Sequence, residues 1–273
     1  MRTRYAGASS GSTRAFDADV LLWRDAVVAN GGSVSLERLI IVDQFVFSEK
    51  EAGTWALTDD YWGFWAENAI QALTSLKQLR LATAVNTPTF TTDRDYTFNA
   101  TTQYISTGFV PSTHGVNFTA SNQRIGFYER TATGSNGLDG GALTTAGSNA
   151  AYIANKNATN VMFAVLNSTA NANFTLSVSS SLGLKAVSRA GGTTVLGYDR
   201  GVRLTDATGL TVSNAARPTH GIFIGGLNNA GTFSSGRACS IGFGVTGGPL
   251  SDAQEAAQSA NIQAWATSVG ANV

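Results

Sequence analysis

The chain has 273 residues, enough for one large domain or for a domain with a smaller attachment. Its 18 basic and 18 acidic residues cancel, so the composition gives no electrostatic reason to expect nucleic acid or an anionic membrane as a partner. Hydrophobic residues make up 43% of the chain, which allows a sizeable core, and the absence of a run of about 18 apolar residues argues against a membrane span.

The N-terminal third of the sequence predicts an arm followed by helices. Residues 1–16 are rich in Gly, Ser, Thr and Arg and predict an extended N-terminal arm that orders only against a partner. From residue 17 onward the apolar residues recur at helical spacing. Ser35 can cap a second helix, whose expected apolar positions are Leu36, Leu39, Ile40 and Phe47. Residues 54–79 predict a third helical stretch, broken near residue 67. We therefore predict a helical region over residues 17–84.

After residue 84 the pattern becomes that of short strands. Alternating or apolar runs such as RIGFYER, NVMFAVLN, LKAVSRA and ACSIGFG are separated by turn-forming clusters every 8–15 residues. Gly191-Gly192 and Asp199-Arg200-Gly201 have the composition of tight turns. Ser251 and Gln254 then form a capping box, which predicts a terminal helix over residues 251–269. Closely spaced strands without intervening helices predict an antiparallel β-sandwich over residues 85–273.

Two stretches resemble known families. GIFIGGLNNAGTFSSGRACSIGFGVTGGPLSDAQEA, residues 221–256, resembles the closing half of concanavalin A-like, laminin-G-like jelly rolls. The helical stretch and AVNTPTFTTDRDYTFNATTQYISTGFVPST, residues 84–113, are similar to tailed-bacteriophage proteins that place short helices before such a sandwich. The resemblance covers most of residues 17–273. It implies a jelly-roll fold, a carbohydrate- or protein-binding surface and a virion origin, and it transfers no catalytic residue.

The acidic residues give little support for hydrolytic chemistry. Retaining glycoside hydrolases need two carboxyl groups about 5–5.5 Å apart, which on one strand requires acidic residues two or four positions apart. Asp93 and Asp95 have this spacing but lie in a Thr-rich loop where a turn is expected. Glu129 is the lone acid of its strand, and Asp199 and Asp206 flank turns. We predict no catalytic residue and no enzymatic activity.

Metal and redox chemistry have equally few candidates. His114 and His220 are the only histidines, and neither has a nearby carboxylate cluster in the sequence. The loop GSNGLDGG around Asp139 resembles an oxygen-rich calcium loop but supplies one carboxylate, fewer than calcium usually takes. Cys239 cannot form an internal disulfide and is expected to be a buried small hydrophobe. We predict no metal and no cofactor.

Carbohydrate binding has more candidate residues. A pyranose has one apolar face and a polar rim, so its sites combine an aromatic ring with hydrogen-bonding side chains such as Asn. The available aromatic residues of the sandwich are Tyr104, Phe118, Tyr128, Tyr152 and Tyr198. The alternative for each is a place in the core or in a cross-strand pair.

The sequence is compatible with three functions. The first expectation is a non-enzymatic structural protein of a tailed-phage virion, facing outward as a capsid decoration or as a tail or fibre component. Its partners would be other virion proteins, reached through the N-terminal region, and further copies of itself, for example in a trimer. The second is a carbohydrate-binding adhesin module that recognises host surface glycan, and the third is a glycoside hydrolase. Neither nucleic acid nor a membrane is an expected partner.

Overall fold

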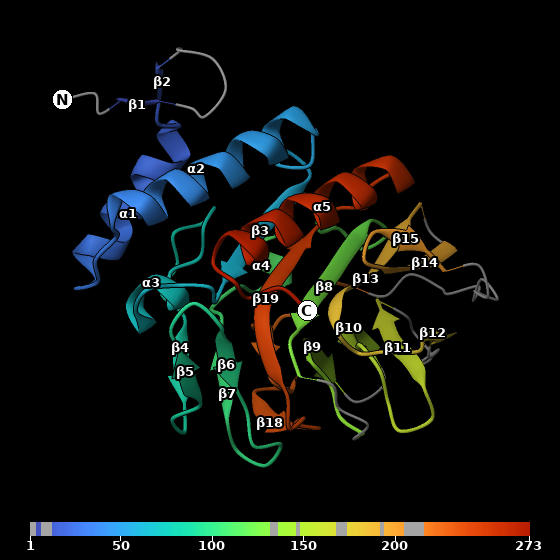
Figure 1. Ribbon diagram of the computed structural model, residues 1–273. Coiled ribbons are helices and arrows are strands. Elements are labelled where there is room, and N and C mark those ends of the chain that lie inside the picture. Colours follow the sequence, from blue (N-terminus) through green and yellow to red (C-terminus); the bar gives the residue numbers. More distant parts are fainter. Residues whose placement is uncertain are drawn as a thin grey trace.

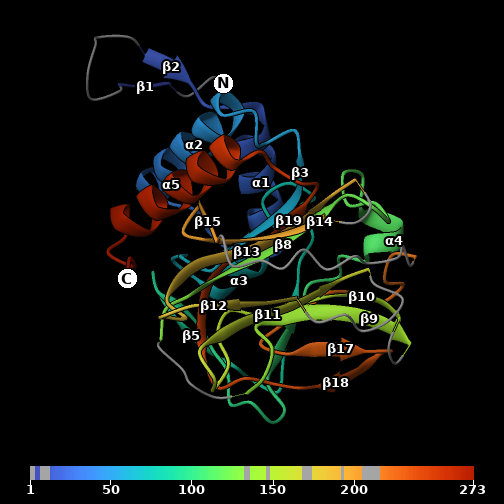
Figure 2. The ribbon, with the colours of Figure 1, turned by 90° about the vertical axis from the view of Figure 1, so that its right-hand side faces the viewer.

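The computed structural model describes residues 4–6, 13–131, 136–145, 148–167, 174–191, 194–204 and 216–273. Within these residues two β-sheets are stacked face to face, and helices cover the outer face of one of them (Figures 1 and 2). Parts of the predicted arm and turns lie outside the described residues, namely residues 1–3 and 7–12, Gly192 and Asp206.

The sheet beneath the helices is called the covered sheet. Its described strands run in the order β15-β14-β13-β8-β19-β6-β5, and β3 pairs with β19. They are β3 (Thr58–Gly63), β5 (Thr89–Thr91), β6 (Asp95–Thr97), β8 (Gln123–Glu129), β13 (Gly183–Ala190), β14 (Thr194–Asp199), β15 (Val202–Arg203) and β19 (Ser240–Gly247). Their pairings are antiparallel.

The second sheet is called the open sheet, because no described helix lies on its outer face (Figure 2). Its order is β12-β11-β10-β9-β16-β7-β4, with β17 paired to β9 and β18. The strands are β4 (Thr83–Val85), β7 (Tyr104–Ser106), β9 (Gly140–Thr145), β10 (Ser148–Ala154), β11 (Val161–Leu166), β12 (Phe174–Ser177), β16 (Phe223–Ile224), β17 (Leu227–Asn229) and β18 (Thr232–Ser234). The β17–β9 pairing is parallel and the others are antiparallel.

The predicted antiparallel sandwich with a C-terminal helix is therefore confirmed, in a jelly-roll-like form. The turn at residues 199–201 joins β14 to β15, and the turn that includes Gly191 joins β13 to β14, as predicted. Strand β19 is buried throughout because it lies between two cores. Ile241 faces the core between the sheets, whereas Phe243 and Val245 face the helices.

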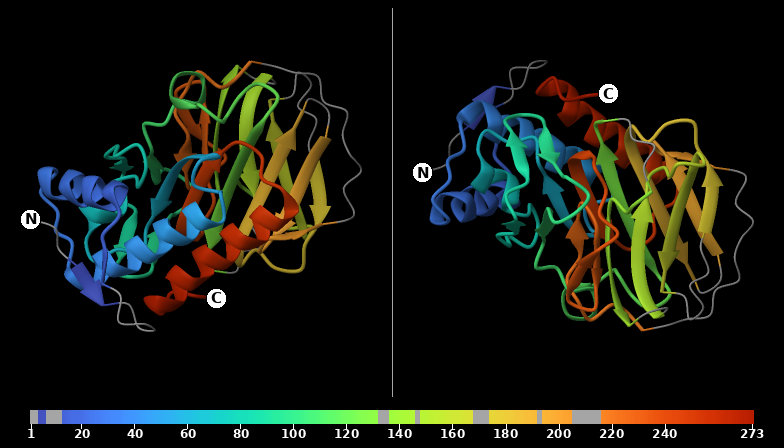
Figure 3. Two further views of the ribbon diagram at one scale, coloured as in Figure 1. Left: turned by 90° about the horizontal axis from the view of Figure 1, so that it is seen from above. Right: turned by 90° about the horizontal axis from the view of Figure 1, so that it is seen from below.

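Five helices are described: α1 (Ala18–Ala29), α2 (Leu36–Glu51), α3 (Ala69–Leu73), α4 (Pro111–His114) and α5 (Asp252–Ser268). Ser35 caps α2 by accepting the Arg38 N–H, and Ser251 and Gln254 form the predicted capping box of α5. Helices α2 and α5 lie side by side over the covered sheet (Figure 3). No helix in the described part of the chain has the length and hydropathy needed to cross a membrane.

Two helix predictions are wrong in part. The stretch 54–79 contains strand β3, which pairs with β19, and only the short helix α3. Its tryptophans are nevertheless buried, as predicted: Trp62 lies in the core between the sheets, and Trp55 and Trp65 lie in the core beneath the helices. In α2, Leu36 and Phe47 were expected to be core positions but are 57% and 43% exposed. The buried positions of α2 instead include Leu39, Val42, Phe45 and Val46.

The N-terminal segment begins as a small hairpin. Strands β1 (Arg4–Ala6) and β2 (Thr13–Ala15) pair with each other and belong to neither sheet of the sandwich. The hairpin projects on the helical side of the molecule (Figure 1). Phe16, which the sequence places in the arm, is 6% exposed and packs in the helical core.

Asp60 is a buried carboxyl group of β3 that should make stability depend on pH. Burial raises the pKa of Asp60 to about 6, although its Oδ1 accepts the backbone N–H groups of Tyr61, Lys77 and Gln78. The folded state therefore keeps a proton that the unfolded chain releases near pH 4. We expect the contribution of Asp60 to the free energy of unfolding to fall as the pH rises from about 4 to about 6.

Denaturant unfolding of the wild type and of Asp60→Asn between pH 4 and 8 tests this expectation. Asparagine keeps an oxygen for the three N–H groups and does not ionise, so the variant should lose this part of the pH dependence. Its stability relative to the wild type should rise by roughly 1.4 kcal/mol for each unit by which folding raises the pKa. Parallel pH profiles for the two proteins would contradict the assignment.

Candidate functional site: a pocket on the open sheet

The open sheet carries apolar side chains on its outer face as well as on its inner face. Side chains of a strand alternate between the two faces. In β10, Ala151 and Ile153 face the core between the sheets, so Tyr152 points outward. In the neighbouring strand β11, Phe163 and Val165 point outward for the same reason. The outer face therefore has a small hydrophobic cluster of its own.

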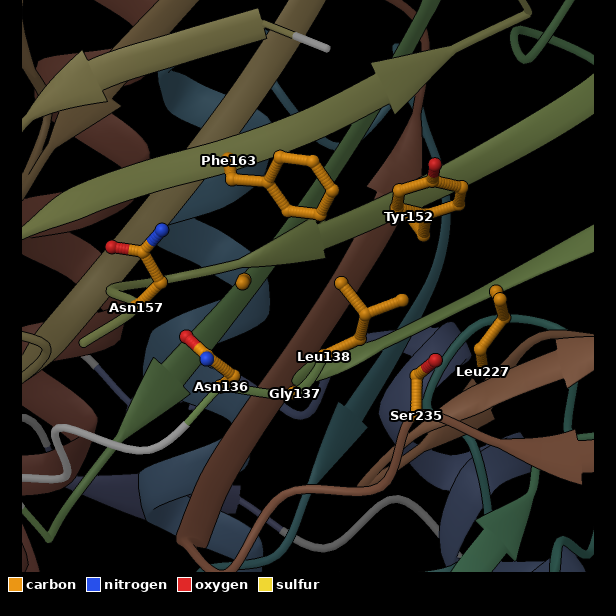
Figure 4. Close-up of a pocket in the computed structure, with 9 residues that line it drawn as sticks. Asn136, Gly137, Leu138, Tyr152, Asn157, Phe163, Leu227 and Ser235 are labelled. Atoms are coloured by element: carbon orange, nitrogen blue, oxygen red, sulfur yellow. The ribbon is translucent and has the colours of Figure 1, made fainter. Parts of the chain in front are cut away.

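This cluster surrounds a pocket with a volume of about 330 Å³ (Figure 4). Its walls come from β10, β11 and β17 and from the loops that precede β9 and follow β10 and β18. Within the described part of the chain, nine residues line it: Asn136, Gly137, Leu138, Tyr152, Ala154, Asn157, Phe163, Leu227 and Ser235. Such a combination of aromatic and apolar walls with a few polar groups is typical of small-molecule sites.

Two aromatic rings form one wall of the pocket. The centroids of Tyr152 and Phe163 are 5.8 Å apart, and the ring planes are inclined by 41°. The rings come close because β10 and β11 pair with Ala154 opposite Phe163. Gly141 makes room on the other side: at its φ of +147° a Cβ atom would lie 2.3 Å from the Cβ of Tyr152. Burial raises the pKa of Tyr152, so its hydroxyl stays protonated near neutral pH.

Uncharged polar side chains lie beside the aromatic wall. Asn157 Oδ1 accepts the backbone N–H groups of Thr159 and Val161, which fixes the side chain in the loop. Its Nδ2 makes no hydrogen bond to the described residues and points toward Phe163 in Figure 4. Asn136 and Ser235 stand on the opposite side (Figure 4). Together these groups offer hydrogen bonds beside an apolar surface.

A buried ion cluster lies behind the pocket. Arg237 places Nη1 3.1 Å from Asp139 Oδ2 and Nη2 3.3 Å from Glu129 Oε2, and all three side chains are fully buried. The backbone N–H of Leu138 donates to the carbonyl of Ser235 at 2.9 Å, which joins two of the lining loops. Asp139 comes directly after Leu138, and Arg237 comes two residues after Ser235. The ion cluster therefore holds the two loops that form this part of the pocket.

The structure brings only one of the predicted aromatic candidates into this pocket, Tyr152. Phe118, Tyr128 and Tyr198 are buried, the last two with their hydroxyl groups bonded to Gln263 and Asp252 on α5. Tyr104 is stacked between Phe223 and Phe233, with centroid distances of 4.2 and 4.8 Å. These four aromatic residues therefore serve in packing, the alternative to sugar binding that the sequence left open.

The acidic candidates are held in ion pairs. Asp93 pairs with Arg38, whereas Asp95 pairs with Arg130 at 2.6 Å, so the two carboxylates serve different partners. Glu129 is not alone as its strand suggested, because Arg237 joins it to Asp139, but this cluster is closed to solvent. Asp199 pairs with Lys185 at 2.7 Å.

The histidines and the cysteine have ordinary structural environments. His114 Nδ1 accepts the Val110 N–H at 2.9 Å, and His220 lies beside Thr219. Cys239 is buried, and burial raises the pKa of its thiol well above the usual range. Among the described residues, no group of three or more His, Cys, Asp and Glu side chains is placed to hold a metal ion.

The residues beside Tyr152 in the pocket, above all Phe163 and Asn157, were not among those predicted from the sequence. Strand β11 reads as a continuous apolar run, VMFAVL, so alternation could not show which side chains face outward. Asn157 is one of many asparagines in the chain, and only the fold places it beside the aromatic pair.

Comparison with known proteins gives fold-level likeness only. No family model and no curated protein matches the sequence. A Trypanosoma rangeli sialidase mutant with trans-sialidase activity is similar in structure, with a TM-score of 0.48 and 11% identity over 81% of this chain. This chain spans 38% of the sialidase's length. Domain 4 of an extracellular GH43 arabinanase from Geobacillus stearothermophilus, solved with arabinotriose, has a TM-score of 0.48 and 9% identity, covering 74% of this chain and 98% of that domain. Neither likeness bears on function.

Proposed function

We propose that the protein is a non-enzymatic carbohydrate-binding module whose ligand site is the pocket on the open sheet. The observation that carries this proposal is the Tyr152–Phe163 wall with Asn157 beside it. A sugar ring can pack its apolar face on the aromatic wall while its hydroxyl groups meet the neutral polar groups. The first test is a glycan array, on which the intact protein should bind a defined set of saccharides.

The positions of the carboxylates support binding rather than hydrolysis, because none lies among the described residues that line the pocket. Most retaining and inverting glycoside hydrolases use two carboxyl groups that face the scissile bond. No Asp or Glu is among the nine lining residues of the pocket. Asp139, the acid next to the lining loop, is fully buried and paired with Arg237. Release of reducing sugar from a bound saccharide, abolished by replacing a single carboxylate, would overturn this part of the proposal.

We further propose that the module belongs to a tailed-phage virion and attaches through its helical side. Two features support this arrangement. The β1–β2 hairpin projects on the side opposite the open sheet, so attachment there leaves the pocket facing outward (Figures 1 and 2). The same side exposes apolar residues of α1 and α2, namely Leu22, Val28, Leu36 and Phe47. Attachment at symmetric virion positions would make the protein a homo-oligomer there.

Deleting residues 2–15 should abolish incorporation of the protein into virions while leaving the sandwich folded. The deletion stops before Phe16, which is buried, and before Asp17, which caps α1. Virions from a phage supplied with the truncated chain would be assayed by quantitative immunoblot. The control is full-length Tyr152→Ala, which should be incorporated normally. A truncated protein present at wild-type copy number would show that the arm is not the attachment.

A further inference from the structure

We infer that the pocket selects an uncharged sugar unit and rejects acidic sugars such as sialic acid and uronic acids. This inference rests on the proposed carbohydrate-binding function and specifies its ligand class. It depends on three features: the described lining residues include no cation, the arginine behind the wall is already paired, and the pocket is small.

The described part of the lining offers no cationic partner for a carboxylate. None of the nine residues that line the pocket is Lys, Arg or His, and its polar side chains other than Tyr152 are Asn136, Asn157 and Ser235. Lys156 precedes Asn157 in the sequence but does not line the pocket. An anion that enters an apolar pocket loses hydration and, without a cationic partner, regains little of that free energy. A sugar hydroxyl needs only a neutral donor or acceptor, which these side chains supply.

The arginine behind the wall does not supply a cationic partner either. Arg237 is fully buried and lies 3.1 Å from Asp139 Oδ2 and 3.3 Å from Glu129 Oε2. Because the guanidinium is bound by two carboxylates and lies behind the Gly137–Leu138 segment, it cannot serve as the cationic partner of a ligand.

The size of the pocket indicates a single sugar unit. A volume of about 330 Å³ lies at the lower end of the roughly 300–1,000 Å³ range of ligand pockets. The two inclined rings of Tyr152 and Phe163 form one corner rather than a row of platforms along a strand. A terminal residue or a side-chain unit of a glycan fits such a corner.

The experiment compares matched pairs of glycans that differ only in an acidic unit. Binding of the full-length protein would be measured by biolayer interferometry to a galactose-terminated oligosaccharide and to the same oligosaccharide capped with sialic acid. Xylan with and without glucuronic acid side chains would form a second pair. We expect the protein to bind the neutral glycan of at least one pair. It should bind the acidic glycan of the same pair at least tenfold more weakly.

A charge placed at the rim tests the electrostatic cause. Asn136 is exposed and its Oδ1 has only a long contact, 3.4 Å, to the Ala158 N–H, so Asn136→Lys should leave the fold intact. The lysine should reduce the ratio of the affinities for the neutral and the acidic glycan of a pair at least threefold. The matched control Asn136→Gln should leave this ratio unchanged. Circular dichroism and thermal unfolding would verify that both variants are folded.

The outcomes separate the two proposals. Equal or tighter binding of the acidic members by the wild type would overturn the selectivity while leaving carbohydrate binding in place. An unchanged ratio in a folded Asn136→Lys variant would overturn the electrostatic cause. Failure of the wild type to bind any saccharide on a broad array would overturn the proposed function itself, and this inference with it.

Discussion

Replacing Phe163 or Tyr152 by alanine should weaken glycan binding by about thirtyfold without unfolding the sandwich. Each ring loses its packing against the apolar face of the sugar, and burial of an aromatic side chain contributes about 2 kcal/mol. About 1.4 kcal/mol corresponds to a tenfold change in the dissociation constant. The measurement is titration of the purified variants with the saccharide that the wild type binds on the array.

Two kinds of control separate lost contact from lost structure. Phe163→Leu and Tyr152→Leu keep most of the apolar volume in the hydrophobic cluster, so their stability should be close to that of the wild type while binding still falls. Phe47→Ala removes an aromatic ring that is 43% exposed on α2, on the opposite side of the molecule, and should bind normally. Full affinity in a folded Phe163→Leu or Tyr152→Leu variant would argue against the aromatic wall as the binding surface.

Breaking the buried ion pair between Arg124 and Glu255 should lower the stability of the protein much more than breaking an exposed ion pair. Arg124 in β8 bonds both carboxylate oxygens of Glu255 in α5 at 2.7 Å, and the side chains are 1% and 0% exposed. Replacing one partner leaves the other as a buried, uncompensated charge, which costs about 3–5 kcal/mol. We expect Arg124→Met or Glu255→Leu to lower the free energy of unfolding by that amount in urea denaturation.

A double-mutant cycle gives the sharper test. Arg124→Met combined with Glu255→Leu removes both charges, so the double variant should be clearly more stable than the sum of the single losses predicts. The exposed pair of Arg24 and Asp25 has the same 2.7 Å separation but side chains that are 34% and 63% exposed. Asp25→Asn should therefore change stability by less than about 1 kcal/mol. Additive losses at Arg124 and Glu255 would show that burial does not couple them.

Helix α5 shows how a capping motif can be predicted when the burial of polar side chains cannot. The capping box of Ser251 and Gln254 fixed the start of the helix in the sequence, because it is a local pattern. The helix buries the apolar residues Ile262, Trp265 and Ala266, but it also buries Glu255 and Gln258, whose burial no local pattern indicates. The polar residues are buried because partners from distant segments meet them.

The partner of Gln258 is a second buried acid. Glu49 in α2 accepts hydrogen bonds at 2.7 Å from both Tyr61 Oη and Gln258 Nε2, and at 2.8 Å from Asn261 Nδ2. The partners of Glu49 come from a strand and from another helix. They lie between 12 residues (Tyr61) and 212 residues (Asn261) away from it in the sequence. No spacing rule in the sequence connects them, because the network exists only once α2 and α5 lie on the covered sheet.

The sequence by itself determined the fold class, most of the strands and the caps of the long helices, because these depend on residues close together in the chain. It also showed Tyr152 as one aromatic candidate among five. Only the tertiary structure decided that β3 is a strand, that helices cover one sheet and leave the other open, and that Tyr152 meets Phe163 and Asn157 at a pocket. Each of these depends on strand pairing and on which side of a sheet stays uncovered, and contacts between distant segments settle both.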